Sequence, residues 1–202
     1  MNTTPQLEPQ TAAGKVLWHF TMSLDGFVAG PNHEMDWMAG FSGKPGLEQE
    51  YTATTGAVLG GRDGWDAFPG ARPYGGGDAW QGSVFVLTHH PEDATPDADV
   101  TFLSCDVAEA VRIALEAAGG KNVEIHSASI GAQLIERGLI DELDLHIVPI
   151  LLGDGIRLFD KPGCAPVRLD RVHDGAPNEE LSVRFRPAAQ RGGGPQEGGA
   201  PC

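Results

Sequence analysis

The order of apolar and helical segments constrains the fold of this chain more than any other feature. Buried-strand patterns are expected at Lys15–Met22, Ala57–Gly60, Val84–Thr88, Val100–Leu103, Val123–His126, Glu142–Leu152, Val167–Val172 and Leu181–Phe185. Helical patterns are expected at Glu48–Thr55, Asp106–Ala118 and Ser129–Arg137. Helices separate the early strands, whereas the last three strands follow one another directly. This order predicts an α/β fold with a mainly parallel central sheet, an antiparallel C-terminal edge and helices on both faces.

The segment Asp106–Ala118 carries the clearest helical signature. Asp106 is placed to cap the helix, and apolar residues recur at helical spacing behind it. Gly119 and Gly120 follow directly and are expected to end the helix.

The two ends of the chain differ in composition from the middle. Residues 1–14 are rich in Thr, Pro and Gln, and residues 187–202 are rich in Gly and Pro, so both are predicted to be disordered. Residues 15–186 then form one domain, which fits the usual domain size of about 100–200 residues.

Charge and cysteine content limit the class of partner and the compartment. The net charge of -14 repels nucleic acid and anionic membranes, so neither is an expected partner. The chain has no apolar run of about 18 residues, and its N-terminus lacks a signal-peptide pattern. Its three widely spaced cysteines contain no C-x-x-C pair, so they predict neither a zinc site nor a disulfide framework. A reduced, cytoplasmic setting is expected.

A polar turn follows the first expected strand, in the sequence TMSLDGFVAG from Thr21 to Gly30. A strand that ends in S-x-D-G, with a second glycine after it, lets the backbone lie close to a ligand. The same letters also describe an ordinary Asp-Gly turn. The sequence leaves both interpretations open.

Two further segments offer backbone amides to an anion. V-L-G-G-R ends a strand at Gly60 and Gly61 and continues into Arg62, whose guanidinium can bind a phosphate. It is neither a Walker loop nor G-x-G-x-x-G, and a solvated arginine after a turn is the alternative. The segment 123–134, VEIHSASIGAQL, runs from a strand through small residues into a helix start that suits a pyrophosphate, although its serines can act merely as N-caps.

The histidines and paired carboxylates give weaker signals. His19, His126 and His146 fall in strands without the spacing of zinc ligands, so they are interpreted as structural and no metal is predicted. His89 and its neighbour follow Thr88 at a strand end, where they lie either near a phosphate or in solvent. Glu48 and Glu50 are expected to be solvated.

Taken in order, these segments resemble the riboflavin-reductase C-terminal domain family, which groups with dihydrofolate reductase. The resemblance rests on SLDGFVAG, on VLGGR and on GLIDEL-x-LHIVPILLG-x-GIRLF, which begins at Gly138, and it spans about residues 15–186. It implies a dihydrofolate reductase-like fold, NADPH as hydride donor, a small-molecule substrate and a homodimer.

The resemblance also assigns roles to individual residues. Adenosine-phosphate contacts are implied for Gly60, Gly61, Arg62, Thr88 and His89, and pyrophosphate contacts for Ser127, Ala128, Ser129, Ile130, Gly131 and Ala132. Met22, Ala29 and the exit at Leu151 are implied near the nicotinamide and substrate. Ser23 and Asp25 are implied to face the substrate, with Asp25 as the first candidate for proton donor and ordered water as the alternative.

Two departures from the family pattern narrow the function. Ser127-Ala128-Ser129 stands where members usually carry a Gly-Gly pair, and no carboxylate sits at the position that folate reduction needs. The expected activity is therefore NADPH-dependent reduction of a small heterocyclic or carbonyl substrate. The alternatives are a riboflavin-pathway 5-amino-6-(5-phosphoribosylamino)uracil reductase and a non-catalytic nucleotide-binding module. Residues 39–46 and 71–82 are expected to define the substrate pocket.

Overall fold

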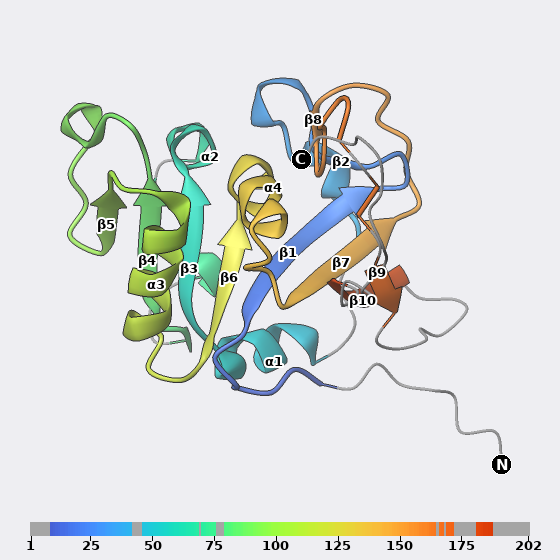
Figure 1. The fold of residues 1–202 in the computed structure, drawn as a ribbon. Helices are drawn as coiled ribbons and strands as arrows, with labels where there is room; N and C mark the ends of the chain where they lie inside the picture. The colour runs from blue at the N-terminus through green and yellow to red at the C-terminus, as the bar shows by residue number, and fades with distance from the viewer. Residues whose placement is uncertain are drawn as a thin grey trace, which may run out of the picture.

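A computed structural model describes residues 9–41, 46–68, 70–75, 79–164, 166–167, 169–171 and 181–187. At its centre is an eight-stranded sheet in the order β5-β4-β3-β6-β1-β7-β10-β9 (Figure 1). Its strands are β1 Val16–Ser23, β3 Thr55–Gly61, β4 Ser83–Leu87, β5 Val100–Leu103, β6 Asn122–His126, β7 Glu142–Val148, β9 Leu169–Arg171 and β10 Leu181–Pro187. A second, two-stranded sheet pairs β2 Phe27–Ala29 with β8 Ile156–Arg157.

Strand directions confirm the predicted architecture. The six strands from β5 to β7 pair in parallel, whereas β10 pairs antiparallel with both β7 and β9. Because a parallel pair needs a crossover connection, helices lie between the early strands, and the last strands return without one.

The α-helices are α1 Leu47–Thr54, α2 Arg62–Ala67, α3 Val107–Ala117 and α4 Ala128–Glu136. Short 3-10 turns lie at η1 Pro31–His33, η2 Asp36–Met38, η3 Pro73–Gly75 and η5 Pro91–Asp93. The expected cap is present at α3, where the Asp106 carboxylate accepts a hydrogen bond from the Ala108 amide at 2.9 Å. Gly119 and Gly120 follow with φ of 60° and 88°, which favour glycine. Among the described residues, no helix is long and apolar enough to span a bilayer.

Successive side chains of a strand point to opposite faces of the sheet, and the two faces differ in polarity. Val123 and Ile125 of β6 belong to the main apolar core together with Ala110 and Ala114 of α3. In Figure 1, α3 and α4 lie in front of the sheet and cover this face. Glu124 lies between those two residues and points to the opposite face, where it is fully buried. The opposite face therefore holds charge in the middle of the sheet.

Toward the β5 edge, the opposite face is apolar. There Val58, Val84, Val86 and Val100 pack with Trp80 in a second cluster. Along this face the buried residues therefore change from apolar near β5 to charged near β6.

Several expected boundaries need correction. The long strand expected over Glu142–Leu152 ends at Val148, because the chain turns at Pro149 and the amide of Ile150 donates to the Val148 carbonyl. The polar segment that follows the first strand, up to Gly30, contains the short strand β2, and Arg62, considered as a solvated residue after a turn, is the first residue of α2.

The chain ends also differ from expectation. Residues 9–14 pack on the domain, since Gln10 is buried and its side-chain amide donates to Glu142 Oε2 at 3.0 Å. The rest of the predicted N-terminal tail, residues 1–8, and residues 188–202 lie outside the described residues. Cys105 is free and exposed, whereas Cys164 is disulfide-bonded, which departs from the expected absence of disulfides.

Candidate functional site

The segments predicted to bind a nucleotide meet at one edge of the sheet. Gly60 and Gly61 end β3, the strand before Thr88 ends beside them, and Ser127 follows the end of β6. Gly60 pairs in register with His126 on one side, and Gly61 pairs with Leu87 on the other. Because these strands are parallel, their carboxyl ends share one edge, the edge at which α/β sheets bind ligands.

The start of α4 faces the glycines of β3. Ser127 caps the helix, and its Oγ accepts from the Ile130 amide at 3.3 Å. A Cβ placed on Gly61 would lie 3.1 Å from that same Oγ, so the two segments are in close contact. The amides of Ala128 and Ser129 are the first two of the helix and have no intrahelical acceptor. An anion at this position would receive those amides and the positive end of the helix dipole.

Arg62 lies at the same edge, held by its own surroundings. Its Nε contacts Asp66 Oδ2 at 2.7 Å, and its terminal nitrogens donate to the carbonyls of His90 and Asp93 at 3.2 and 2.9 Å. These contacts join α2 to the turn after β4. A guanidinium has two N–H groups on each terminal nitrogen, so one remains on each for a ligand.

Thr88 and His89 have different environments. Thr88 is buried, and its hydroxyl accepts from the His90 amide at 3.1 Å. His89 is exposed. Thr88 therefore shapes the turn that Arg62 contacts, and the His89 side chain is available to solvent or a ligand.

Ser23 and Asp25, the residues predicted to face the substrate, connect two loops through hydrogen bonds. The Asp25 carboxylate accepts from the Ser23 hydroxyl at 2.6 Å and from the Leu152 and Gly153 amides at 3.1 and 2.8 Å. Ser23 is fully buried, and its Oγ also accepts from the Phe27 amide. These bonds connect the end of β1 to the loop after β7, which also contains the exposed Leu151.

These hydrogen bonds change the role that Asp25 can take. The hydrogen bond from Ser23, assisted by the two loop amides, lowers the pKa of Asp25 to about 2. An ionised Asp25 has no proton to donate at neutral pH, so the structure favours a loop-holding role over the expected role as proton donor. The buried Ser23 supports these hydrogen bonds, and its expected position facing a substrate stays a prediction.

Asp25→Ala is expected to loosen the loop after β7. The substitution removes the acceptor of the Leu152 and Gly153 amides, so their hydrogen exchange should become about tenfold faster or more. Exchange measured by NMR or mass spectrometry checks this. Asp154→Ala is the control, because Asp154 bonds only the adjacent Gly155 amide and should leave residues 152–153 unchanged.

Ala29 lies where the two loops cross. It pairs with Ile156 in the small sheet, and a Cβ on Gly155 would lie 2.1 Å from the Ala29 carbonyl oxygen. Gly155 has φ of 132°, a conformation that side chains rarely adopt. The glycine-rich exit after β7 therefore brings the loop of Leu151 against β2.

Sequence reasoning missed a polar cluster on the face of the sheet opposite α3 and α4. We call it the central polar cluster, and it consists of His19, Tyr51, Tyr74, Glu124, His126, Asp144, His146 and Arg184. Its members come from β1, β6, β7, β10, α1 and η3. Tyr74 belongs to the 71–82 loop, which was expected to define the substrate pocket.

Glu124 is the centre of one half of this cluster. Its Oε2 contacts His19 Nδ1 and His126 Nε2, both at 3.0 Å, and its Oε1 accepts from the Thr55 hydroxyl at 2.5 Å. Tyr74 donates to Oε2 as well. Burial opposes the charge of Glu124, but the neighbouring histidines outweigh it and hold its pKa well below the ordinary range.

Asp144 is the centre of the other half. Its Oδ2 accepts from Tyr51 at 2.6 Å and from Arg184 Nε at 2.7 Å. Arg184 also reaches Glu50 Oε1 at 2.6 Å, so Glu50 is ion-paired and not solvated as expected. Burial lowers the pKa of His146 to about 4, which keeps this ring neutral beside the pair at neutral pH.

The sequence does contain a signal for the cluster. V-E-I-H, L-D-L-H and W-H-F-T each place polar residues at every second position of a strand that is otherwise apolar. A strand buried on both faces normally reads as continuously apolar, so this alternation indicates a polar inner face. The histidines were interpreted one by one as structural, and their common face was not considered.

Comparisons with known proteins agree with this fold. The RibD C-terminal domain family matches residues 76–177, just over half of the chain. The uncharacterized protein YwjB of Bacillus subtilis strain 168 is 28% identical over 153 residues, covering 72% of this chain and 82% of the relative.

Solved structures share the fold at low sequence identity. A putative riboflavin biosynthesis protein from Shewanella sp. PV-4 has a TM-score of 0.69 at 19% identity, covering 87% of this chain and 99% of that one. Dihydrofolate reductase from Enterococcus faecalis, complexed with NADP(H), has a TM-score of 0.58 at 14% identity, covering 87% and 98%. With a dihydrofolate reductase-like sheet and a matching family profile, this chain belongs to the RibD C-terminal domain family.

Proposed function

We propose that this protein is an NADPH-dependent reductase of a small heterocyclic or carbonyl substrate. The observation that carries the proposal is the convergence of two segments far apart in the sequence at one sheet edge: the strand end Gly60-Gly61 with the adjoining Arg62, and the start of α4 at Ser127. Bare amides, a helix N-terminus and a guanidinium are the groups that bind phosphates in proteins of net negative charge. Membership of a reductase family and the fold shared with an NADP(H)-bound reductase support the same reading.

The chain's residues fit a dinucleotide along this edge. The amides of Ala128 and Ser129 would hold the pyrophosphate, and the free N–H groups of Arg62 would bind the adenosine phosphate. Gly61 has no side chain, so the dinucleotide can approach the backbone at this position. A Cβ here would lie 3.1 Å from Ser127 Oγ. Bound NADPH supplies the hydride, and the protein supplies orientation and electrostatics. Orienting the two reactants correctly can remove about 7–11 kcal/mol of barrier in favourable cases.

The central polar cluster is the proposed floor of the substrate pocket. His126 ends β6 directly before the helix cap at Ser127, so the cluster reaches the cofactor edge. Its residues offer hydrogen-bond donors and acceptors to a flat polar heterocycle, and the His126 side chain is partly exposed.

One observation favours a riboflavin-pathway substrate as the second candidate. A phosphoribosylaminopyrimidine is anionic and needs a cation near the end of β1. Arg157 supplies one, since its Nη1 donates to the Asp25 carbonyl at 3.2 Å and its guanidinium lies 4.3 Å from the Phe27 ring centroid. NADPH oxidation screened across pterins, phosphorylated pyrimidines and carbonyl compounds distinguishes the two. Tight NADPH binding without turnover of any compound would instead favour a nucleotide-binding module.

Arg62→Ala is expected to weaken NADPH binding about tenfold to a hundredfold and NADH binding less than threefold. The reason is the loss of charge-assisted hydrogen bonds of about 1.5–3 kcal/mol to a phosphate that only NADPH carries. Titration of both dinucleotides by calorimetry checks this. Arg112→Ala, an exposed arginine on α3 paired with Glu109, is the control and should change neither affinity. Equal losses of the two dinucleotides would remove the role proposed for Arg62.

A further inference from the structure

We propose that His19, Glu124 and His126 form a binding site for one divalent first-row transition metal ion of the zinc type. One ligand atom from each residue lies within 4.8 Å of the other two, and the site lies on neighbouring strands β1 and β6. Two imidazoles and one carboxylate form a donor set that binds Zn²⁺, Fe²⁺ and Co²⁺ in proteins. The inference stands independently of the proposed reductase activity.

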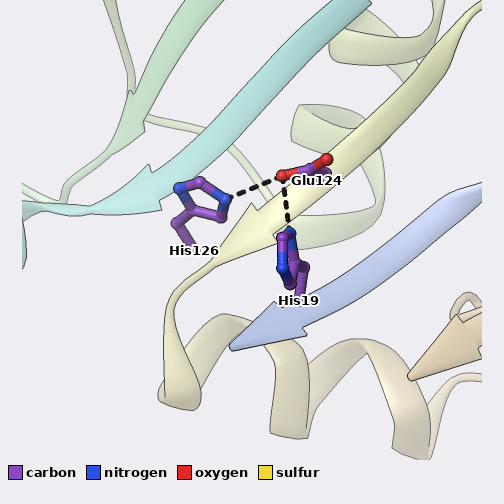
Figure 2. Close-up of side chains that lie close together, drawn as sticks. All are labelled: His19, Glu124 and His126. Carbon is purple, nitrogen blue, oxygen red and sulfur yellow. Dashed lines mark hydrogen bonds and ion pairs between the residues drawn. The ribbon is translucent and has the colours of Figure 1, made fainter. Parts of the chain in front are cut away.

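The three ligand atoms converge on one point. Figure 2 shows the two imidazole rings reaching the same end of the Glu124 carboxylate from different sides. Both N···O distances are 3.0 Å. Metal–ligand bonds of about 2.0–2.2 Å at tetrahedral angles place neighbouring ligand atoms about 3.3–3.6 Å apart, close to these distances. The side chains therefore need little rearrangement to bind an ion.

The number of donors around one oxygen points the same way. Glu124 Oε2 contacts His19, His126 and Tyr74, whereas a carboxylate oxygen has about two lone pairs. A metal ion replaces the two imidazole protons and leaves one lone pair for the tyrosine hydroxyl. The arrangement is then balanced atom by atom, which hydrogen bonds from all three donors do not achieve.

Each ligand is also supported by a second contact. Thr55 donates to the other oxygen of Glu124 at 2.5 Å, and His19 Nε2 lies 2.9 Å from His146 Nε2. Hydrogen bonds of this kind fix the orientation of metal-ligating histidines and carboxylates. Glu124 is fully buried while the His126 side chain is 36% exposed, so an ion has a path from solvent.

A second group of potential ligands provides the matched control. His90, Glu92 and Asp93 also lie close together, but all three are exposed and lie in one short turn. They lack the buried carboxylate and the supporting contacts, so we assign them no site. His90→Ala removes an imidazole of the same kind without touching the proposed ligands.

The test is binding of Co²⁺ to the metal-stripped full chain, followed by visible absorption, with displacement by Zn²⁺. The expected result is one Co²⁺ per chain with ligand-field bands, at least a hundredfold weaker binding in His126→Ala, and unchanged binding in His90→Ala. His19→Ala should match His126→Ala, and circular dichroism confirms that each variant is folded.

Three results would overturn the proposal. These are the absence of saturable Co²⁺ binding to the wild-type chain, equal binding by wild type and His126→Ala, and a loss in His90→Ala as large as in His126→Ala. NADPH titration of the same samples is a separate measurement. Loss of nucleotide binding would count against the reductase proposal and leave the metal result standing.

Discussion

Arg184→Met is expected to lower the free energy of unfolding by about 3–5 kcal/mol, the usual cost of removing one partner from a buried ion pair. Arg184 is 2% exposed and bonds Asp144, which is fully buried, and Glu50. Methionine fills similar volume, so the loss comes from leaving the Asp144 carboxylate without its cation. Urea unfolding of the two proteins at neutral pH measures the difference.

The same substitution has a predictable pH dependence. Burial opposes ionisation of Asp144, but His19 and Arg184 outweigh it and hold its pKa below the ordinary 3.8. A lowered folded pKa stabilises the protein above 3.8, and this contribution disappears as pH falls through the folded value. The difference between wild type and Arg184→Met should therefore be full at neutral pH and shrink below pH 3.8.

An exposed ion pair supplies the control for this experiment. Arg112 bonds Glu109 and Glu116 on the outer surface of α3, and Arg112→Met should lower the urea midpoint far less than Arg184→Met, because exposed ion pairs contribute little to stability. If the two variants unfold at the same urea concentration, Arg184 is not the counter-charge of the central polar cluster. A loss in Arg184→Met that does not change with pH would instead assign its effect to packing.

Local sequence features predicted the positions of most strands along the chain and, within one residue, the ends of α3 and α4. The cap at Asp106 and the glycines at 119 and 120 act on adjacent backbone groups, so their effect can be read from neighbouring letters. The small sheet of β2 and β8 was missed because it joins residues about 130 positions apart through only two register pairs. No local pattern encodes such a pairing.

The candidate site likewise has one part that the sequence predicted and one part that it did not. The strand end at Gly60-Gly61 and the helix start at Ser127 were predicted as phosphate-binding segments because each follows its strand directly in the sequence, and the structure brings the two together at one edge. The central polar cluster was not predicted, because it depends on which strands are neighbours. Glu124 and His19 are 105 positions apart and meet only since β1 lies beside β6. Tyr51 and Asp144 are 93 positions apart and meet across the face that α1 covers.

Gly131→Ala is expected to destabilise the protein by about 2 kcal/mol although alanine is the better helix former. A Cβ on Gly131 would lie 2.0 Å from the ring of Trp18, which is 1% exposed and sits in the main core on β1. Overpacking of this kind costs about 1–3 kcal/mol or more, against a propensity gain of up to about 1 kcal/mol. Thermal or urea unfolding measures the net effect.

Gly64→Ala is the matched substitution, because Gly64 is also helical and a Cβ there has nothing within 4 Å. It should stabilise by up to about 1 kcal/mol, the opposite sign. The comparison also reaches function, since α4 can relieve the clash only by moving away from Trp18, and this shifts the amides that follow Ser127. NADPH affinity should then fall in Gly131→Ala along with stability. Unfolding of Gly131→Ala at or above the wild-type urea midpoint would show that the close packing of α4 on Trp18 does not require this glycine.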